Sequence, residues 1–531
     1  MKKYFLVFVV ALTSAPLFSA LWLMNGNFSL SFTDVDEGNA LVISRYYNSL
    51  GPSRGMFGYG WGTQMEARLS AVAGPLVMIE EAPSGGRSHY IDKTKDTPGS
   101  IVDKLIKLSN AAANGKEYIT KLRQNILRDT VLIYQYAKTN NLKAEKIAEG
   151  TVLENVERQD EKLKKIKNGY VRIKPDGSTD QFDNEGRLAK RTLVSGRHLV
   201  FDYDGRGNLS AITDSLGRSI KLYIGGKGLL DKIVLYNNKV ATYSYDDQNN
   251  LVESTDANGK TYKYKYNSYH KVIEVVYGKE KWTIGYDSNN GKVVYQKTPD
   301  GWEIFTEYAS DKSKDQYYDK ISLIKKYANE VVSEVYEMWK RPRPDGSLYM
   351  YKSREKIGDK EKTITFTMCC STPLVVNDNG KITRYEYNKD GKLKKKVHPD
   401  GRVITVDYDA GGRITSIVNN NRPYKFQYNS KGQIVLAASN VAKFKMDYDG
   451  NGNLSKVLDT SGNQFSIKYD ELGRMNELVT NYGSIRLAYE RDNTPVRIES
   501  SGSDQNMSKM QGVYQDYLDL MSVFKLADID M

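Results

Sequence analysis

The sequence predicts a mainly β protein whose chain folds as spiralling antiparallel β-hairpin repeats. Three observations lead to this fold class: aromatic residues recur every 20 to 22 residues, turn signals follow them, and polar and aromatic side chains alternate between the turns. Hairpins that stack side by side merge into one continuous sheet, and the natural twist of strands makes such a sheet coil. We therefore expect a long coiled sheet that is closed or partly open.

The aromatic repeat extends over most of the chain after residue 168. A gap of 79 residues, close to four periods, separates two groups of aromatic anchors. Tyr327, Tyr349 and Phe366 fit the spacing loosely, so we expect degenerate repeats in this gap and no separate domain. The regular anchors are Phe182, Tyr203, Tyr223, Tyr245, Tyr266, Tyr286, Tyr308, Tyr387, Tyr408, Tyr428, Tyr448, Tyr469 and Tyr489.

Each period contains two turn signals, in which Asp opens the turn and Gly supplies a positive φ, as in Asp204 and Gly207. The tripeptide Pro-Asp-Gly marks four turns. Between turns, the segment 260–266 places tyrosines at every second position, which is the period of a strand. Two strands of seven residues, each about 23 Å long, and two turns account for one period. The repeat is therefore predicted to be a β-hairpin.

Composition narrows the class of protein. The chain has 531 residues with 13 Pro and 43 Gly, which excludes collagen-like and low-complexity chains. Its 39 tyrosines favour strands, because aromatic side chains suit a pleated, half-buried surface. Two cysteines exclude a disulfide scaffold and a four-cysteine zinc site. The net charge of +12 favours anionic partners in general without naming one.

Residues 1–20 have the pattern of a secretory signal peptide. Lys2 and Lys3 precede an apolar run from Tyr4 to Leu12, and small residues follow. No later stretch approaches 18 consecutive apolar residues, so we expect no membrane span. The sequence thus predicts an exported protein that is periplasmic, on the outer surface or secreted. Export and the even spread of charge argue against nucleic acid as a partner.

Motifs in the repeats, and ahead of them, resemble the RHS/YD-repeat family, which includes the teneurin shell. The repeat motifs are Tyr203-Asp204, Tyr448-Asp449 and the run YDELGR at 469–474. A lead-in segment, LVISRYYNS at 41–49 followed by GMFGYGW, is similar to the segment that precedes the repeats in this family. The resemblance implies an N-terminal β segment over 21–97 and a YD-repeat β-shell over 168–500.

The same resemblance implies a hollow shell, which in many family members encloses a C-terminal toxin. Family toxins follow a junction that contains Asp-Pro, and this sequence has no Asp-Pro dipeptide. We therefore expect the shell without a recognisable toxin domain and without self-cleaving aspartates.

Two segments depart from the β pattern. Residues 98–167 carry apolar side chains at steps of three and four, such as Ile101 and Leu105, and predict two or three helices. This helical insertion either caps an edge of the sheet, since exposed edges need covering, or offers a docking face to a partner. The tail, 501–531, is apolar at helical spacing from Val513 to Phe524. It is predicted to be a helix that plugs the open end of the sheet or lies on a partner.

Candidate chemistry is sparse. The segment 51–55 matches the G-x-S-x-G pattern of hydrolases, but a Gly-rich and aromatic stretch follows where that motif needs a helix. Residues 449–453 begin like a calcium loop, but Thr460 stands where a bidentate Glu belongs, so we expect a turn. The four histidines are scattered. The sequence predicts no enzyme, no cofactor and no metal site.

The adjacent pair Cys369 and Cys370 is a candidate redox pair. A disulfide between neighbours brings the Cα atoms closer than the roughly 4.4–6.8 Å that disulfides favour. Buried free thiols, a strained vicinal disulfide and a cross-link to a partner remain alternatives, and export makes oxidation credible.

Trp282 and Trp302 are the candidate ligand-stacking residues. They are one period apart, which would make them neighbours on adjacent hairpins. Two indoles beside Lys279, Lys281 and Lys297 suit a sugar with an acidic group, through stacking and hydrogen bonds. The alternative is that both rings pack inside the shell.

Two functions fit these features. The first is an exported, non-enzymatic protein of the bacterial envelope or surface, acting as a binding or adhesion scaffold for an anionic glycan or an envelope protein. The second is a shell component that encloses or delivers a separately encoded effector in bacterial antagonism or predation. The second hypothesis rests on fold analogy alone.

Overall fold

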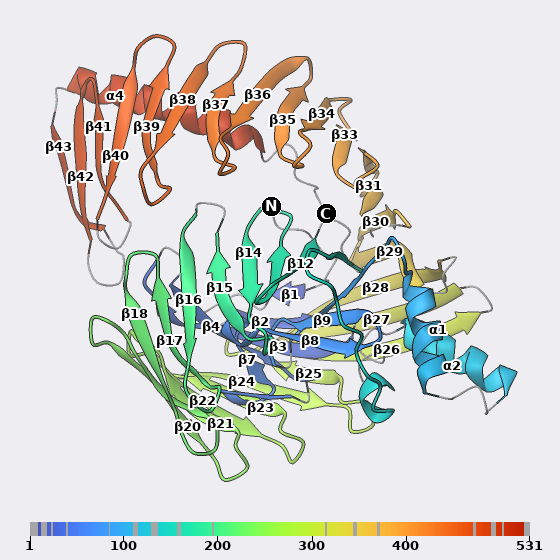
Figure 1. Ribbon diagram of the computed structural model, residues 1–531. Coiled ribbons are helices and arrows are strands. Elements are labelled where there is room, and N and C mark those ends of the chain that lie inside the picture. Colours follow the sequence, from blue (N-terminus) through green and yellow to red (C-terminus); the bar gives the residue numbers. More distant parts are fainter. Residues whose placement is uncertain are drawn as a thin grey trace.

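The computed structural model places most of the chain in one antiparallel sheet (Figure 1). The residues that it describes are 9–11, 18–22, 25–38, 41–51, 53–83, 85–109, 115–128, 136–156, 161–193, 196–313, 316–343, 348–368, 372–470, 474–489, 495–501 and 504–524.

Thirty-six strands, β8 (Arg68–Ala73) to β43 (Pro495–Ser501), form this sheet, and each strand pairs with the next along the chain. Among the described residues no pairing joins β43 to β8, so the sheet is open. Near its start the sheet meets itself, because the Leu69 amide donates to the Gly186 carbonyl at 2.8 Å. In Figure 1 the sheet forms a lower cup that continues into an upper arc.

The lower cup contains strands of four to seven residues. After β8 they are β9 (Leu76–Glu80), β10 (Arg87–Ile91), β11 (Val152–Asn155), β12 (Lys162–Ile166), β13 (Gly169–Ile173), β14 (Thr179–Phe182), β15 (Leu188–Thr192), β16 (His198–Tyr203), β17 (Leu209–Asp214), β18 (Ser219–Ile224), β19 (Leu230–Val234), β20 (Val240–Tyr245), β21 (Leu251–Thr255), β22 (Thr261–Tyr266), β23 (Val272–Tyr277), β24 (Glu280–Tyr286) and β25 (Val293–Lys297).

The anchor tyrosines join successive strands, which confirms the predicted hairpin repeat. The hydroxyl of Tyr203 donates to the carbonyl of Leu188 at 2.9 Å, 15 residues earlier. The same bond, 14 or 15 residues back, is made by Tyr245, Tyr266, Tyr286, Tyr308, Tyr387, Tyr408, Tyr428, Tyr448, Tyr469 and Tyr489.

Tyr223 is predicted to be an anchor, but it does not occupy the anchor position in the structure. The β-bulge that precedes the anchor in other repeats falls one residue later here, between Tyr223 and Ile224. Because neighbouring residues of a strand face opposite sides, this shift turns Ile224 inward and leaves Tyr223 44% exposed.

The middle of the sheet differs from the degenerate repeats that we expected. It consists of strands with 10 to 13 residues, and the sheet passes through them without interruption. Tyr327 ends one long strand and Tyr349 lies near the start of another, so neither occupies an anchor position. Phe366, by contrast, follows a β-bulge at the end of the strand 360–366, as the regular anchors do, and is 4% exposed. The long strands are β26 (Glu303–Ser313), β27 (Gln316–Tyr327), β28 (Glu330–Pro342) and β29 (Leu348–Ile357).

The upper arc returns to short hairpins. Its inner face is apolar, with Phe426, Phe444 and Phe465 at most 3% exposed. The strands from the long hairpins onward are β30 (Lys360–Phe366), β31 (Pro373–Asp378), β32 (Lys381–Tyr387), β33 (Leu393–Val397), β34 (Val403–Tyr408), β35 (Ile414–Asn419), β36 (Arg422–Tyr428), β37 (Ile434–Ala438), β38 (Lys443–Tyr448), β39 (Leu454–Asp459), β40 (Gln464–Tyr469), β41 (Met475–Thr480), β42 (Gly483–Tyr489) and β43.

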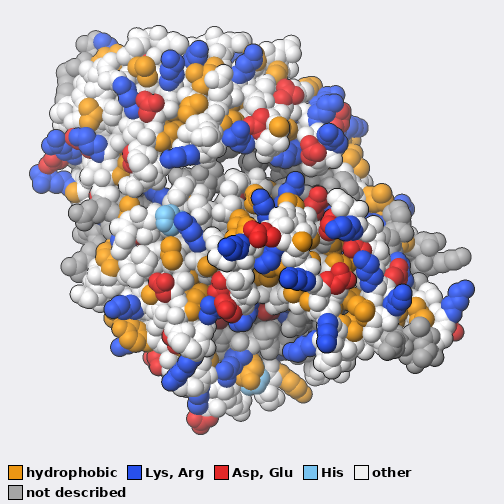
Figure 2. Space-filling view, viewed as in Figure 1, with side chains coloured by type: hydrophobic (Ala, Val, Ile, Leu, Met, Phe, Trp, Pro, Cys, Tyr) orange, Lys and Arg blue, Asp and Glu red, His pale blue; other side chains and the backbone are white. Residues whose placement is uncertain are grey.

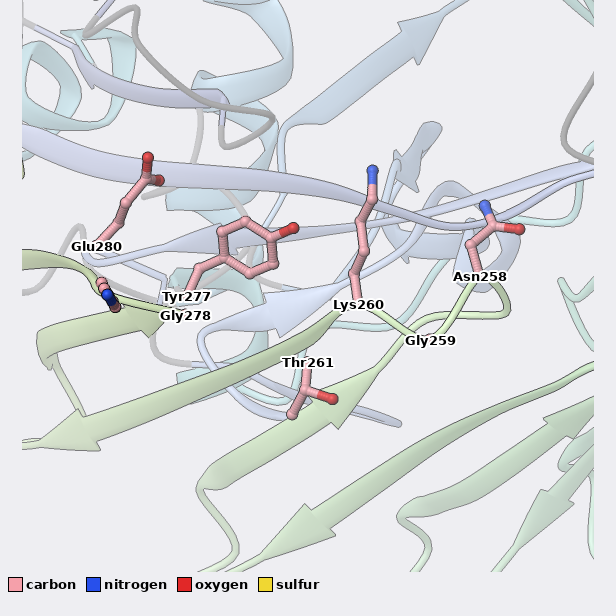
Figure 3. A pocket seen from close by; sticks show the side chains of 8 residues that line it. Asn258, Gly259, Lys260, Thr261, Tyr277, Gly278 and Glu280 are labelled. Carbon is pink, nitrogen blue, oxygen red and sulfur yellow. The ribbon is translucent and has the colours of Figure 1, made fainter. Parts of the chain in front are cut away.

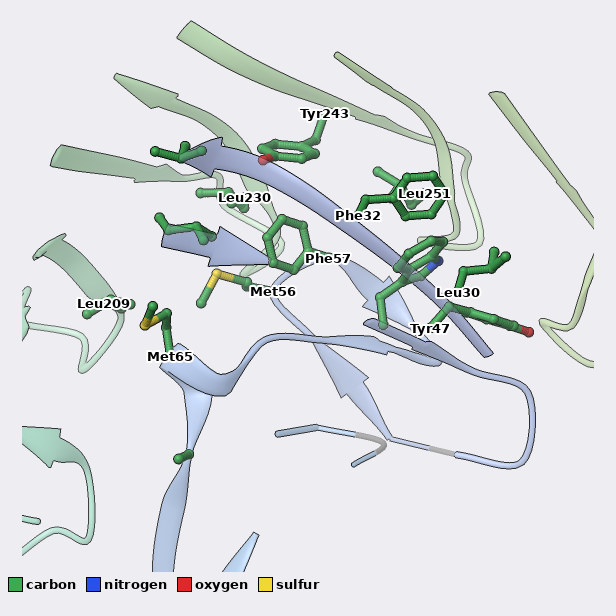
Figure 4. Packing of buried hydrophobic residues seen from close by; sticks show 14 of the residues in the cluster. Leu30, Phe32, Tyr47, Met56, Phe57, Met65, Leu209, Leu230, Tyr243 and Leu251 are labelled. Atoms are coloured by element: carbon green, nitrogen blue, oxygen red, sulfur yellow. The ribbon is translucent and has the colours of Figure 1, made fainter. Parts of the chain in front are cut away.

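The N-terminal β segment lies inside the lower cup (Figure 1). Its side chains pack against inner residues of the cup, as Figure 4 shows for Phe57 and Tyr243, whose ring centroids are 5.0 Å apart. The segment contains a five-stranded sheet, a small hairpin and one 3-10 turn. These are β1 (Val9–Ala11), β2 (Phe18–Trp22), β3 (Asn27–Asp36), β4 (Val42–Asn48) and β7 (Trp61–Gly62), then β5 (Arg54–Gly55) with β6 (Gly58–Tyr59), and η1 (Gln64–Glu66).

A buried ion pair fixes this segment to the cup. The Arg45 guanidinium donates to Asp34 at 2.8 Å, and both side chains are at most 1% exposed. Arg45 also donates to the hydroxyls of Tyr264 (2.9 Å) and Ser254 (2.7 Å), which belong to the cup. Tyr243 donates to Asp34 at 2.9 Å. Each of the three guanidinium nitrogens thus donates to a partner, as burial of a charge requires.

Strand β1 and the first three residues of β2 fall within the predicted signal peptide, and β2 pairs with both β1 and β3. Residues 1–8 and 12–17 of that peptide lie outside the described residues. The signal peptide remains a prediction.

The helical insertion is shorter than predicted. Helices α1 (Pro98–Leu108) and α2 (Lys116–Arg128) are present, but β11 and β12 already belong to the sheet before residue 167. The segment 162–166 alternates around a buried Leu163, which is the period of a strand. The helices pack on the first strands of the cup, where Ile101 and Leu105 meet Leu76 in one apolar cluster.

The predicted tail helix is α4 (Asp504–Ser522), and it covers the inner face of the upper arc (Figure 1). Tyr517 makes edge contacts with Phe444 and Phe465, at 5.9 and 5.3 Å between ring centroids. Leu520 is 4% exposed. Both halves of the sheet therefore have their inner faces covered by other segments of the same chain.

Candidate binding site

An open pocket of about 580 Å³ lies at one edge of the sheet (Figure 3). It is formed where the turn between β21 and β22 meets the turn between β23 and β24. The pocket is lined by Asn258, Gly259, Lys260, Thr261, Tyr277, Gly278, Lys279 and Glu280.

The side chains of the pocket are aligned by the strand register. Tyr277 pairs directly with Glu280 and with Tyr262, and the two tyrosine rings stack at 4.8 Å between centroids. Residues that pair directly lie on the same face of a sheet. Figure 3 shows Tyr277, Glu280 and Lys260 extending to the same side of the strands. The pocket thus combines one ring with groups of both charges.

The charged groups of the pocket are not neutralised by near neighbours. Among the described residues, Lys260 and Lys279 have no carboxylate, and Glu280 has no cation, within 4.0 Å. Oxygen Oε2 of Glu280 is buried without a hydrogen-bond partner. Two ammonium groups are therefore available to a ligand, and the carboxylate of Glu280 lies beside them with one of its oxygens buried.

The structure places the two predicted stacking residues differently from each other. Trp282 lies in β24, is 4% exposed and packs in the core of the lower cup. Trp302 precedes β26, is half-buried and stacks on Tyr327 at 5.4 Å between centroids. Because β25 lies between their strands, about 9.6 Å separates the two positions. The two indoles are not direct neighbours.

The three lysines that were predicted to lie beside these indoles have different surroundings. Lys279 lines the pocket. Lys281 donates to Glu274 at 2.6 Å, and Lys297 donates to Glu303 at 3.0 Å. Hydrogen bonds from lysines lower the pKa of both carboxyl groups. Lys281 and Lys297 are therefore already paired, whereas Lys279 is free for a ligand.

The other candidate residues have structural partners or lie outside the described residues. Asp449 accepts from the amides of Asn451 and Asn453 at 2.9 and 2.8 Å, so this segment is the expected turn. The last two residues of the G-x-S-x-G match form the strand β5, which pairs with β6 in a hairpin. Cys369 and Cys370 lie outside the described residues.

Sequence reasoning missed Lys260, Tyr277, Glu280 and Tyr327. One signal was present, since Tyr277 is followed by Gly278 and is directly preceded by a strand-like run. That signal indicates a turn, but it does not show that two consecutive turns on one edge enclose a pocket.

Charge and metal chemistry are unremarkable elsewhere in the described part of the chain. Figure 2 shows Lys and Arg interspersed with Asp and Glu over the visible face. Within the described ranges no group of three or more His, Cys, Asp or Glu side chains could hold a metal ion. None of the described helices is long and apolar enough to cross a membrane.

Family comparisons agree with the repeat and the lead-in segment. The model of the teneurin YD-shell matches residues 345–526, and the RHS repeat matches 182–219 and 233–279. A domain of unknown function, DUF6531, matches 22–89. The chain belongs to the RHS/YD-repeat family. The shell-type fold of RHS/YD-repeat proteins is generally non-catalytic, and this protein is a shell-like scaffold in which no toxin domain is evident among the described residues.

Two solved structures show a weak similarity to this chain. The crystal structure of TcdB2-TccC3 is 10% identical with a TM-score of 0.40, and the match covers 66% of this chain and 24% of that chain. The Photorhabdus luminescens Tc holotoxin pore is 10% identical with a TM-score of 0.41, covering 91% of this chain and 32% of that one. The RHS/YD-repeat protein thus spans 24% and 32% of the length of those two chains. No curated protein sequence matches it.

Proposed function

We propose that this RHS/YD-repeat protein is an exported, non-enzymatic scaffold of the bacterial envelope or surface that binds an anionic glycan through the pocket at Tyr277. The observation that carries the proposal is the pair of ammonium groups without a carboxylate partner, Lys260 and Lys279, beside the half-buried ring of Tyr277.

The pocket chemistry suits an acidic sugar. The apolar face of a pyranose packs on a tyrosine ring, and the ammonium groups attract a carboxylate. Glu280 and Asn258 offer acceptors to sugar hydroxyls. An envelope protein with an acidic loop is the other partner that this charge arrangement accepts.

A second function, a shell that holds or delivers a separately encoded effector, is favoured by the open sheet. An open sheet leaves a route to its interior. Against it stands the covering of both inner faces, by the N-terminal β segment and by α4, because a guest would have to replace these segments.

Purification of the protein from its own host separates these functions. Mass spectrometry of co-eluting chains and a glycan array are performed on the same sample. Array binding that is lost in Lys260→Ala and kept in Lys227→Ala, an exposed lysine of another turn, supports the pocket. A stoichiometric polypeptide partner together with no glycan binding supports the shell function and contradicts our proposal.

A further inference from the structure

We infer that one end of the long strands binds the surface of an anionic lipid bilayer. We call this end the tip, defined by residues 309–313 of β26, 316–320 of β27, and 339–343 and 348–352 on either side of the turn from β28 to β29. The inference does not use the pocket at Tyr277. It adds a separate contact to the proposed envelope scaffold.

The tip extends beyond the strands on either side of it. β25 pairs with β26 only at residues 303–305, so the part of β26 from Thr306 to Ser313 pairs with β27 alone. On the other side, β30 pairs with β29 from Lys352 onward and leaves 348–351 without a second partner. The eight residues of β26 beyond this pairing extend about 26 Å. Among the described residues, no further strand flanks the tip.

Both faces of the tip are accessible. Each described residue of the tip is half-buried or exposed, whereas Ile321 and Met338, directly next to it on their strands, are 2% and 0% exposed. The covering that buries the inner face of the lower cup therefore ends before the tip.

Aromatic side chains gather at this accessible end. Tyr318 pairs directly with Trp339, and the centroids of their rings are 5.4 Å apart. Tyr317 is the neighbour of Tyr318 in β27, so it faces the opposite side of the sheet. Tyrosine and tryptophan are enriched at the interface between lipid and water, because each ring is apolar and carries one polar group. The rings of the tip are Tyr317, Tyr318, Trp339, Tyr349 and Tyr351.

Basic side chains lie over four of these rings. The guanidinium of Arg341 is 3.9 Å from the ring centroid of Tyr351, and Nζ of Lys352 is 4.8 Å from that of Trp339. Long basic side chains rest on apolar surface in this way and extend their charged ends toward water or headgroups. The other two pairs are Arg343 with Tyr349 and Lys312 with Tyr317.

The tip carries an excess of positive charge. Its described residues include six Lys or Arg and two Asp, and the turns 314–315 and 344–347 add one Lys and two Asp, which leaves an excess of three positive charges. Lys320, Arg341 and Lys352 have no carboxylate within 4.0 Å among the described residues. Each basic residue close to an anionic bilayer strengthens binding about fivefold.

These features fit a bilayer surface better than a single rigid ligand. A glycan or a folded protein that docks on a sheet contacts one face, whereas lipid headgroups surround a strand end that enters them. Rings on both faces of the tip can therefore all contact the interface at once. The positive excess selects an anionic bilayer over a neutral one.

The test measures co-sedimentation of the full chain with vesicles of phosphatidylcholine, with or without about 30% phosphatidylglycerol. We expect binding to the anionic vesicles that weakens at high salt, and little binding to the neutral ones. Arg341→Ala combined with Lys352→Ala should weaken binding to the anionic vesicles roughly 25-fold, about fivefold for each cation. The matched control is Lys443→Ala combined with Lys445→Ala, which removes two exposed lysines of β38 and should leave binding unchanged.

Trp339 provides a second measurement, which a change in net charge would not affect. Brominated lipid in the anionic vesicles should quench part of the tryptophan fluorescence of the parent protein. Trp339→Phe should remove this quenching and keep vesicle binding, because phenylalanine retains an aromatic ring at the same position. Circular dichroism of each variant confirms that it is folded.

Other outcomes would overturn the inference. Equal binding to neutral and anionic vesicles, or equal loss in the tip variant and its control, would show that the charges of the tip do not direct binding. Quenching that persists in Trp339→Phe would show that another part of the protein contacts lipid. Lys260→Ala should weaken glycan binding and leave vesicle binding unchanged, so the failure of this inference and the failure of the proposed function are distinguishable.

Discussion

At the scale of single residues, the tyrosine hydroxyl and the turn aspartate explain most of the unusual composition. Each anchor hydroxyl satisfies a strand carbonyl, as Tyr266 does for Leu251 at 2.8 Å. Turn aspartates such as Asp204 and Asp459 bind the amides two and four residues later, in Asp204 at 2.9 Å. These bonds pair backbone groups that the bulges and turns remove from the sheet ladder.

The first prediction concerns Asp34. Replacing Asp34 with Asn leaves the buried Arg45 without its counter-charge, so we expect a loss of about 3–5 kcal/mol in the free energy of unfolding. Urea denaturation measures this loss in the free energy of unfolding. Lys297→Ala, which breaks an exposed ion pair, is the control and should leave the midpoint unchanged. Equal midpoints for Asp34→Asn and the parent would show that the pair does not fix the N-terminal segment.

The second prediction concerns alkaline pH. Burial raises the pKa of Tyr203, Tyr408 and Tyr428 to about 12, above the usual value of about 10. Above pH 10 the folded protein holds more protons than the unfolded chain, so stability falls with rising pH. We expect full stability below pH 10 and progressive loss as pH rises from 10 through 12. Absorbance at 295 nm and circular dichroism should change together, and full tyrosine ionisation in a folded protein would contradict this.

At the scale of elements, α4 and the N-terminal segment perform the same physical task in the two halves of the sheet. Each covers an apolar inner face that would otherwise meet water. The burial of Phe465 against Tyr514 and Tyr517, at 5.4 and 5.3 Å between ring centroids, shows that α4 is part of the upper core. The tail helix was predicted to lie either on the sheet or on a partner. In this structure it lies on the sheet of its own chain.

The third prediction tests α4. Leu520→Ala should cost about 2–3 kcal/mol and expose the inner face of the upper arc, because Leu520 is 4% exposed. Binding of a hydrophobic dye and urea denaturation measure the two effects. Leu518→Ala, two residues away on the same helix and 39% exposed, is the matched control and should change neither. Dye binding by both variants would show that α4 is held by other contacts.

At the scale of the whole molecule, the core is divided. One apolar cluster fills the lower cup and a second lies between α4 and the upper arc, and Met350 packs against both. In a repeat protein each unit contacts chiefly its neighbours, so distant parts are coupled only through the units between them. The two halves therefore have largely independent stabilities.

The fourth prediction follows from this division. Unfolding by urea should show two transitions, with Phe465→Ala lowering one midpoint and Asp34→Asn lowering the other. Tryptophan fluorescence reports the lower cup, because Trp61 and Trp282 belong to its cluster. Circular dichroism reports both halves. A single transition that both substitutions shift equally would show that the sheet unfolds as one unit.

The hairpin repeat, its turns and the anchor tyrosines could be predicted because they depend on residues within about 21 positions of one another. Alternation identifies strands, and Asp with Gly identifies turns, whatever the rest of the chain does. The error at Tyr223 arose where a bulge moved by one residue, since a one-residue shift reverses the face of a side chain without changing the spacing.

The sequence by itself determined a mainly β chain of hairpin repeats with a lead-in segment and a terminal helix. Tertiary structure alone decided that the sheet stays open, that Trp282 is buried and Trp302 is not, and that two turns enclose a pocket. The contacts that settle these points join distant residues, as Arg45 and Tyr264 do across 219 positions. Local pattern specifies each hairpin, whereas the accumulated twist of many strands specifies which hairpins meet.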